Sequence, residues 1–416
     1  MVKLRTQAWI ADTETAFDLP QGWDVTCYPP VDAPALDDPG MRESLANPID
    51  TQTIAEIARG KHSAAIVVDD LSRPTPAADI LPYVLSELNR AGVADGGIRI
   101  VIGGGSHRPL TEEEIAKKVG ADAARRCKVY NHDAYSGELT GLGNLPDGTP
   151  VYINPVVADS DIKIGVAGVF PHPNAGFGGG AKIILPGVCG IATIAYFHSQ
   201  FAYRGRGNIE EQGGQEDMRT IAEKTARLAG LDLVVNAVLN SRREVAGLFT
   251  GDVVAAHRAA AKFARRVYST PIPRAGVQSC DIVIINAYPL DYDPVQVSKS
   301  AWPLEVFDKA YRVTISAASD GIPYHGLGEG MDYRRYLAQK QKASAVSVPG
   351  RVEVTSKDQF IMLSQNYSAA DFYGRFENGL LFTDWRTLIG QLEHCQPRAT
   401  VAVLPCSGIQ LPEIVG

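Results

Sequence analysis

Residues 64–103 read AAIVVDDLSRPTPAADILPYVLSELNRAGVADGGIRIVIG, and this stretch decides the fold. It holds an apolar run at 64–69, then apolar positions at helical spacing over 77–91, and then a second apolar run at 98–103. Short β-rich runs that alternate with amphipathic helices are typical of βαβ units, whose strands lie parallel in one sheet. The stretch therefore predicts an α/β fold with a largely parallel sheet.

The same alternation of strands and helices continues to the C-terminus. We expect a helix that begins near Thr111, a long amphipathic helix over about 252–268, and strands at 161–166, 231–239, 281–286, 313–317, 352–355 and 400–404. Proline and glycine cluster in TPIPRAG at 270–276, which marks a domain boundary. The sequence thus predicts two α/β domains, 1–270 and 271–416. Because ligands of such folds bind at the carboxyl ends of strands and between domains, we expect the active-site cleft there.

Composition and charge argue against several classes of protein. The chain of 416 residues is 45% hydrophobic and 21% charged, and no apolar run approaches the length of about 20 residues that a membrane helix needs. The N-terminus carries no apolar run of signal-peptide length, so we expect a cytoplasmic protein. The net charge of −7, without a basic block, disfavours nucleic acid as a partner. The six cysteines form no C-x-x-C pair, which disfavours a thiolate zinc site and a disulfide framework. A small molecule is the expected partner.

Two loops that directly follow predicted strands carry polar groups suited to a ligand. In DDLSRPTP, at 69–76, Arg73 offers a planar set of donors for a carboxylate or phosphate, and Asp70 can orient it. In GGGSHRP, at 103–109, glycines allow close backbone approach, and the reference pKa of histidine, about 6.5, suits His107 to proton transfer. Each loop also has a purely structural explanation. The first can be a helix cap with a surface arginine, and the second a glycine turn with a hydrogen-bonded histidine.

The third segment is FPHPNAGFGGGAKIILPG at 170–187, and IATIAYFH follows it and ends at His198. Its glycines offer N–H groups for an anion, and a helix that followed them would add its positive end. The pattern G-x-x-x-x-G-K-[ST] is not met around Lys182, so a nucleotide-dependent kinase is disfavoured. Neither His172 nor His198 has a closely spaced zinc partner. A metal held here must therefore draw most of its ligands from elsewhere.

These segments resemble, in the same order, those of the nickel-pincer lactate racemase superfamily. The resemblance rests on PHPNAGFGGGAKIILPG followed by FHS, on DDLSRPTP and GGGSHRP upstream, and on YPLDYDPVQVSKS downstream, which together span 69–299. Four ordered matches are far more specific than any one of them. Gly178 departs from the pattern, since many relatives carry serine there. No motif matches beyond Lys299.

The resemblance implies a cofactor, the nickel pyridinium-3,5-bisthiocarboxylate mononucleotide, also called the nickel-pincer nucleotide. It is joined to a lysine, and its nickel is held by two sulfurs, a ring carbon and one histidine. By position Lys182 resembles the attachment lysine and His198 the nickel ligand. Residue chemistry agrees, because a desolvated lysine is a competent amine nucleophile and a tridentate organic ligand leaves room for one imidazole. The other expected cofactor-binding residues are Asp70, Gly178, Gly179 and Gly180.

His107 and His172 resemble the family's catalytic pair. The resemblance implies that one deprotonates the 2-hydroxyl while hydride moves to the pyridinium ring, giving a 2-keto acid, and that the other serves after the keto group turns over. Histidine can act as acid or base at neutral pH, which suits this double role. Arg73 would clamp the substrate carboxylate, and Gln296 and Lys299 would close over it from the second domain. A solvated surface lysine is the alternative at position 299.

The function that follows is a nickel-pincer-dependent racemase or epimerase of a lactate-like 2-hydroxy acid. The sequence leaves open the C2 epimerisation of an aldonate sugar acid, the racemisation of malate or an aryl hydroxy acid, and a cofactor-free small-molecule-binding α/β protein. Cofactor-biosynthesis enzymes are expected as transient partners, and a homo-oligomer is left open. Among the other histidines only His325, in GIPYHGLGEG at 321–330, is a candidate for setting substrate choice, from a loop of the second domain. We expect His62, His257 and His394 to be structural or solvated.

Overall fold

The computed structural model describes the chain except for residues 146–147, 200–206, 209–216 and 343–345. The chain divides into two compact units. The larger unit comprises 33–265 and 324–338, and the smaller unit comprises 1–32, 266–323 and 339–416. Both are α/β, as the alternation in the sequence predicts.

The sequence predicts two continuous domains, and the two compact units of the structure depart from this prediction in two segments. The expected boundary at residue 270 lies close to the division at residues 265 and 266, but 1–32 groups with the smaller unit and 324–338 with the larger one. The first segment joins the smaller unit through β3 (Asp24–Cys27), which pairs in parallel with β19 (Thr400–Leu404). A pairing between the two ends of the chain leaves no local pattern in the sequence.

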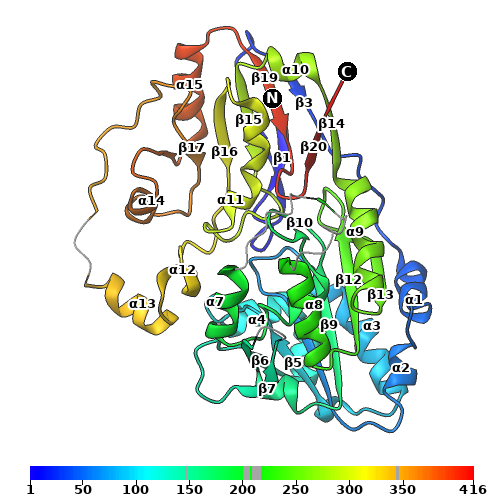
Figure 1. Ribbon diagram of the computed structural model, residues 1–416. Helices are drawn as coiled ribbons and strands as arrows, with labels where there is room; N and C mark the ends of the chain where they lie inside the picture. The colour runs from blue at the N-terminus through cyan, green and yellow to red at the C-terminus, as the bar shows by residue number, and fades with distance from the viewer. Residues whose placement is uncertain (146–147, 200–206, 209–216, 343–345) are drawn as a thin grey trace. The chain divides into compact units, whose positions relative to one another are not determined.

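The larger unit is built on a six-stranded sheet of order β13-β12-β9-β4-β5-β6 (Figure 1). Its strands are β4 (Ala64–Val68), β5 (Ile98–Ile102), β6 (Lys128–Asn131), β9 (Ile162–Gly168), β12 (Leu233–Leu239) and β13 (Val245–Gly251). Only the pair β12 and β13 is antiparallel. Every residue of β4 and β12 is buried, which is typical of parallel strands covered on both faces. The predicted parallel sheet is confirmed.

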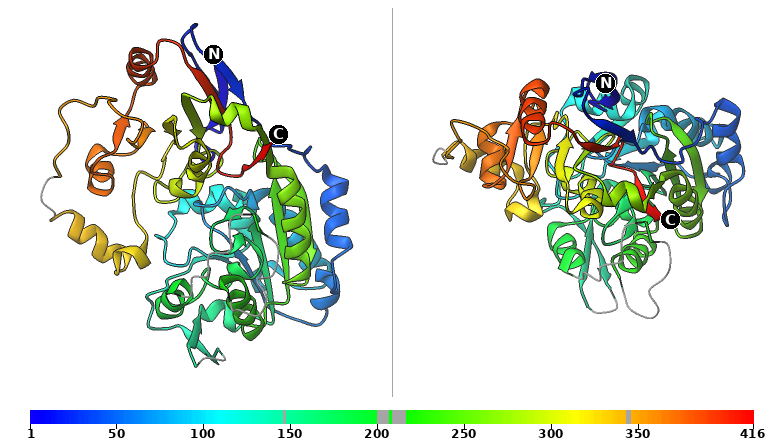
Figure 2. Two further views of the ribbon diagram at one scale, coloured as in Figure 1. Left: turned by 45° about the horizontal axis from the view of Figure 1, so that its top comes forward. Right: turned by 90° about the horizontal axis from the view of Figure 1, so that it is seen from above.

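Helices and short strands complete the larger unit. The helices that begin in it are α1 (Asp38–Ala46), α2 (Ile54–Ile57), α3 (Ala77–Arg90), α4 (Glu112–Val119), α5 (Ala121–Arg126), α6 (Pro155–Ala158), α7 (Ile191–Ser199), α8 (Met218–Leu228), α9 (Ala255–Tyr268), α12 (Gly326–Glu329) and α13 (Tyr333–Lys340). The short strands form two hairpins, β7 (Thr140–Asn144) with β8 (Pro150–Ile153), and β10 (Pro171–His172) with β11 (Gly176–Phe177). Helices α1 and α2 pack on α3, while α7 packs on α8 (Figure 2).

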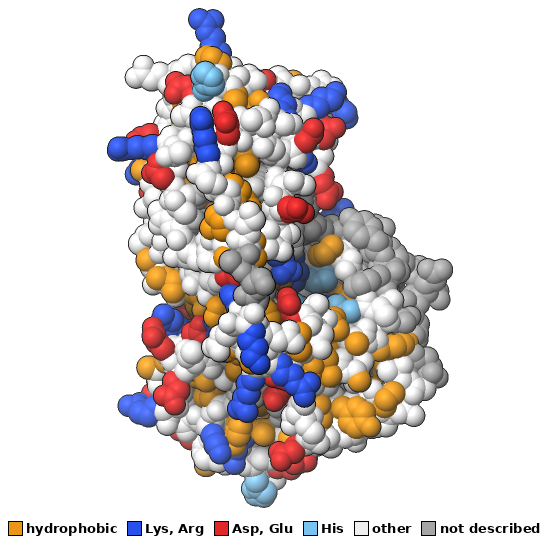
Figure 3. All heavy atoms as spheres, turned by 90° about the vertical axis from the view of Figure 1, so that its left-hand side faces the viewer, with side chains coloured by type: hydrophobic (Ala, Val, Ile, Leu, Met, Phe, Trp, Pro, Cys, Tyr) orange, Lys and Arg blue, Asp and Glu red, His pale blue; other side chains and the backbone are white. Residues whose placement is uncertain are grey.

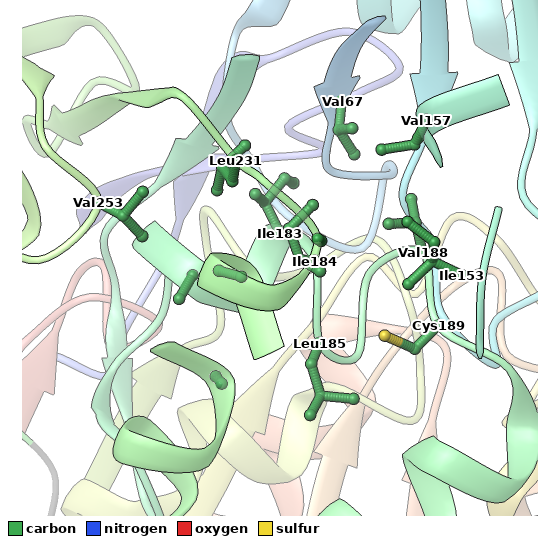
Figure 4. Close-up of a cluster of buried hydrophobic side chains, with 14 of the residues drawn as sticks. Val67, Ile153, Val157, Ile183, Ile184, Leu185, Val188, Cys189, Leu231 and Val253 are labelled. Atoms are coloured by element: carbon green, nitrogen blue, oxygen red, sulfur yellow. The ribbon is translucent and has the colours of Figure 1, made fainter. Parts of the chain in front are cut away.

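A buried core anchors the segment that contains Lys182. The chain forms a 3₁₀ helix over Gly180–Ile183, and α8 packs against it. Directly after Lys182 come Ile183, Ile184 and Leu185, which are all buried in one hydrophobic cluster with Val67 of β4 (Figure 4). Burial of three successive apolar side chains fixes the backbone on one side of the lysine.

The smaller unit has a sheet of order β18-β17-β16-β15-β19-β3 in which all strands are parallel. Its further strands are β15 (Ile282–Asn286), β16 (Tyr311–Ile315), β17 (Ile361–Leu363) and β18 (Leu380–Phe382), with the pairs β1 (Val2–Thr6) and β2 (Thr13–Phe17), and β14 (Ser269–Pro273) and β20 (Leu411–Val415). Its helices are α10 (Arg274–Gln278), α11 (Val297–Ser300), α14 (Ala369–Arg375) and α15 (Trp385–Cys395), with a 3₁₀ helix at Trp302–Phe307.

The strand expected at 352–355 is wrong. No strand forms there, because the side-chain amide of Gln391 on α15 donates to the carbonyl of Val352 and accepts from the N–H of Val354. A side chain thus takes the place of a neighbouring strand, and the next strand is β17.

The surface and the helices carry two general features. On the face drawn in Figure 3, basic and acidic side chains are interspersed. None of the helices in the described part of the chain has the length and apolar character needed to cross a membrane.

Candidate active site

The loops singled out in the sequence follow three neighbouring strands. β4 lies between β9 and β5 and is parallel to both, so the loops after these strands leave the same edge of the sheet. The Gly168 N–H donates to Asp69 Oδ2 at 3.1 Å, and the Gly105 N–H donates to the carbonyl of Gly187 at 2.9 Å. Loops 69–76 and 103–109 are therefore each tied to the chain that carries His172 and Lys182.

His107 is held by a carboxylate. Its Nδ1 lies 2.6 Å from Asp70 Oδ2, and the Ser72 hydroxyl donates to Asp70 Oδ1 at 2.5 Å. Burial acts to raise the pKa of Asp70, but the imidazole of His107, the charge of Arg73 and the Ser72 hydrogen bond hold this pKa well below its usual range. An ionised carboxylate accepts the Nδ1 proton of His107. The neutral ring then carries its lone pair on Nε2, which is the arrangement of a base.

A buried ion pair fixes the loop that carries Asp70, and sequence reasoning missed it. The Nζ of Lys118 on α4 lies 2.5 Å from Asp69 Oδ1 and donates to the carbonyls of Arg73 at 3.2 Å and Thr75 at 2.9 Å. The Lys118 side chain is fully buried, and this burial lowers its pKa while Asp69 opposes the shift. Removing one partner of such a pair leaves an uncompensated charge in the core, so each residue holds the other in place.

His172 is held by the backbone instead. It lies on β10, and the hairpin with β11 brings the N–H groups of Asn174 and Ala175 to its Nδ1, each at 3.2 Å. A nitrogen that accepts hydrogen bonds carries the lone pair, so the neutral ring of His172 has its proton on Nε2. The two histidines therefore favour opposite tautomers.

Lys182 lies in surroundings that favour a neutral amine. Its Nζ is 4.9 Å from the centre of the Phe197 ring and 3.8 Å from the sulfur of Met218. Burial, together with the charges of Arg219 and Arg73, lowers the pKa of Lys182 well below its usual value. A neutral amine is the nucleophilic form of lysine, which a covalent attachment requires.

His198, in the last turn of α7, is oriented as a metal-binding imidazole is. Its Nδ1 lies 2.8 Å from the carbonyl of Ile194, so Nδ1 donates and Nε2 carries the lone pair. Metal-binding histidines typically donate their other ring N–H to a carbonyl or carboxylate in this way. The Lys182 amine lies 4.9 Å from the centre of the Phe197 ring, and the His198 ring centre lies 5.2 Å from it, so both side chains border one phenyl ring. These two residues fit a cofactor that attaches through an amine and brings most metal ligands itself.

Within the described residues, no group of three or more His, Cys, Asp or Glu side chains is arranged to hold a metal ion.

The glycines before Lys182 differ in what they allow. Gly179 and Gly180 have φ of +70° and +58°, and an added Cβ would lie 2.8 Å from Val169 Cγ2 and 2.8 Å from the His257 ring, respectively. At Gly178 the nearest atom to an added Cβ would be 3.5 Å away, which is ordinary contact. The serine of many relatives would thus fit at 178, whereas 179 and 180 require glycine.

The backbone of this glycine loop is engaged by the protein itself. The N–H groups of Gly178 and Gly180 donate to the Phe170 carbonyl and to Asn236 Oδ1. Arg219 donates to the carbonyls of Phe177 and Gly179, and His257 Nε2 lies 2.9 Å from the carbonyl of Gly178. Close backbone approach is what the glycines provide here, and their part in cofactor binding stays a prediction. The helix expected directly after them is only a 3₁₀ turn, since α7 begins at Ile191.

Three of the residues singled out in the sequence lie in the C-terminal half of the chain: Gln296, Lys299 and His325. Gln296 and Lys299 belong to the smaller unit, at the N-cap and within α11, and their role in substrate binding stays a prediction. His325 was expected on a loop of the second domain, but the segment that contains it groups with the larger unit. That segment is 324–338, and the ring centre of His325 lies 5.1 Å from that of His107.

Comparison with known proteins agrees with these features. The family model of the lactate racemase N-terminal domain matches residues 10–208. The chain is 33% identical over 312 residues to a lactate racemase of Lactiplantibacillus plantarum, covering 72% of this chain and 71% of the relative. It is 31% identical over 309 residues to one of Thermoanaerobacterium thermosaccharolyticum, covering 72% and 69%. The chain belongs to the lactate racemase family.

The fold of this lactate racemase family member is that of a solved relative. Its TM-score is 0.72 with the lactate racemase apoprotein of Thermoanaerobacterium thermosaccharolyticum, at 23% identity over 99% of both chains. The TM-score is 0.62 with a protein of Thermotoga maritima, at 16% identity over 92% of this chain and all of that one. The resemblance drawn from the four sequence segments is confirmed, and the protein is an isomerase of the racemase type.

Proposed function

We propose that this protein racemises or epimerises a lactate-like 2-hydroxy acid with a nickel-pincer nucleotide, linked to Lys182 and bound through its nickel to His198. The observation that carries the reaction is the pair of histidines on loops at one edge of the sheet, His107 with a carboxylate at Nδ1 and His172 with two backbone N–H groups there. The relatives named lactate racemase support the reaction class. The lowered pKa of Lys182 and the Nδ1 hydrogen bond of His198 support the cofactor.

Inversion at C2 needs a hydroxyl proton to leave and return and the C2 hydrogen to move between faces. When bound, the cofactor supplies an acceptor for hydride from C2 and a donor that returns it. His107 takes the hydroxyl proton at Nε2, and the ionised Asp70 stabilises the imidazolium that results. His172 acts as the acid in its charged form, which gives the Nε2 proton to the oxygen after the carbonyl has turned over and becomes a neutral ring.

His172 has to change its contacts during this cycle. A histidine that gives and takes a proton at Nε2 carries a second proton on Nδ1 when it is charged. The N–H groups of Asn174 and Ala175 occupy Nδ1. His172 therefore has to release both amides before it acts as the acid, whereas His107 keeps Asp70 throughout.

The substrate carboxylate is assigned to Arg73. Its guanidinium donates to the hydroxyl of Ser72 at 3.0 Å, beside Asp70, and its charge contributes to the lowered pKa of Lys182. A planar fork of donors at that place suits a carboxylate attached to the reacting carbon. Gln296 and Lys299 of the smaller unit are proposed to contact the same group.

The alternative functions are racemisation or epimerisation of another 2-hydroxy acid, such as an aldonate, malate or an aryl hydroxy acid, and small-molecule binding without a cofactor.

Protein produced alongside cofactor-biosynthesis enzymes should carry a mass adduct on Lys182 and one nickel per chain, and Lys182→Met should carry no adduct. The loaded protein should then convert single enantiomers of lactate to the racemate. Absence of both adduct and nickel would overturn the proposal, and turnover of a different hydroxy acid would correct only the substrate.

A further inference from the structure

A segment distant in sequence is tied to the loop that carries His107. Residues 324–338 belong to the larger unit, although the chain before and after them belongs to the smaller one. The Gly326 N–H donates to the carbonyl of Ser106 at 2.8 Å, and the carbonyl of Gly326 accepts from the Tyr135 hydroxyl at 2.8 Å. Ser106 directly precedes His107, so this backbone hydrogen bond sets the segment against the catalytic loop.

Position 326 admits only glycine. An added Cβ would lie 2.6 Å from the hydroxyl oxygen of Tyr324 and 2.7 Å from the carbonyl oxygen of Ser106. Real Cβ atoms do not approach other atoms so closely, and the carbonyl cannot swing aside as a side-chain end can. The absence of a side chain is therefore what lets residues 325 and 326 reach the loop.

This approach places two imidazole rings together. The ring centres of His107 and His325 are 5.1 Å apart with an interplanar angle of 65°, an edge-to-face contact. Asp70 Oδ2 at 2.6 Å and Ser72 Oγ at 3.3 Å both contact His107 at one atom, Nδ1. Hydrogen bonds at one ring atom leave the ring able to tilt about that atom, and a flat group against the ring removes this freedom.

We propose that His325 is a positioning residue for His107, whose ring it holds so that Nε2 keeps one direction toward the substrate. The inference rests on the proposed function. The contact requires a flat ring at position 325 and does not require that ring to ionise. The role is therefore distinct from proton transfer, and a phenyl ring should fulfil it.

Two substitutions in the cofactor-loaded enzyme separate the ring from its nitrogens. His325→Ala should lower kcat for racemisation by about 10- to 100-fold, the cost of misplacing a reacting group by about 1 Å, with KM changed less than about threefold. His325→Phe should stay within about threefold of the natural enzyme in both constants. Equal losses of kcat in the two variants, or no loss in either, would overturn the positioning role.

A second measurement uses the apoprotein and needs no activity. In protein labelled with ¹³C in its histidine rings, the His107 signal is the one that disappears in His107→Gln. It should shift in His325→Ala and stay near its natural position in His325→Phe, because a neighbouring aromatic ring shifts the resonance of the other. A signal unmoved by His325→Ala would refute the contact. Inactive loaded enzyme with a moved signal would overturn the proposed function and leave the contact standing.

Discussion

His107 and His172 are imidazoles at the same edge of one sheet, yet their Nδ1 atoms face opposite kinds of partner. An ionised carboxylate faces His107, and two backbone N–H groups face His172. The carboxylate accepts the Nδ1 proton of His107, so a neutral ring has its lone pair on Nε2. The amides favour a neutral ring with its proton on Nε2. Two residues of the same type thus hold their ring proton on different nitrogens, because different partners contact Nδ1.

The largest effect should come from removing either imidazole. His107→Gln and His172→Gln should each lower kcat on the order of 10²- to 10⁴-fold, the usual contribution of a general acid or base. Initial rates with each enantiomer measure this. The Lys182 adduct and the circular dichroism spectrum should stay unchanged in both variants. Full activity in either variant would remove that histidine from the mechanism.

The buried ion pair between Lys118 and Asp69, which fixes the loop that carries Asp70, can be removed without changing either histidine. Lys118→Met should destabilise the protein by about 3–5 kcal/mol, because it leaves Asp69 as a buried unpaired charge. Denaturant unfolding measures the change. The matched control is Lys117→Met, since Lys117 lies on the surface in an ion pair with Glu113 on the same helix. That variant should change stability by less than about 1 kcal/mol. Equal effects of the two substitutions would refute the buried pair.

Replacing the carboxylate tests the difference between the two histidines directly. Asp70→Asn keeps the shape of the side chain but removes the charge that stabilises the His107 imidazolium, so kcat should fall by about 100-fold. It should also remove a pH dependence of stability. The pKa of Asp70 is lower in the folded than in the unfolded protein, so its contribution is present above about pH 4 and is lost as the pH falls further.

Thermal unfolding of the natural protein and of Asp70→Asn, followed from pH 7 to pH 3, measures that contribution. The natural protein should be the more stable at pH 7, and the difference should shrink toward pH 3. A difference that is constant across this range would show that the charge of Asp70 does not stabilise the fold.

The smallest effect is expected in the glycine loop that follows β11. Gly178→Ser should leave kcat and the melting temperature nearly unchanged, because the nearest atom to its Cβ would be 3.5 Å away. Gly179→Ser is the control, and it should cost about 1–3 kcal/mol since its φ is +70° and its Cβ would meet Val169. Denaturant unfolding midpoints of the two variants measure both changes in stability. Similar losses in both would mean that position 178 also requires glycine.

The local pattern of apolar and polar residues was sufficient to predict much of the fold and the position of the site loops. Apolar runs predict β4 and β5 within one residue, and because parallel neighbours end at one edge, the loops after them had to converge. Pairings between distant parts of the chain, such as β3 with β19, leave no such pattern. The expected strand at 352–355 failed because a glutamine side chain takes up its backbone groups.

The polar residues that support the site were the hardest to foresee. Lys118, Arg219 and His257 lie on amphipathic helices, where charged side chains are usually solvated. Only the packing of those helices turns the three side chains inward, onto Asp69 and onto carbonyls of the glycine loop. The apolar periodicity of the sequence gives the direction of a helix face but not which polar residue at its margin is buried.

The carboxylate behind His107 also bears on what happens between turnovers. In the proposed reaction each inversion moves one proton from one histidine to the other, so the enzyme that releases one enantiomer is not in the form that binds the same starting enantiomer. Asp70 stabilises the form with the proton on His107 and so makes the two forms unequal. At high substrate concentration the return of that proton becomes a step of its own. The enzyme then stays, after product release, in the protonation state that formed the last enantiomer. The maximal rates in the two directions therefore differ, although the equilibrium mixture is racemic.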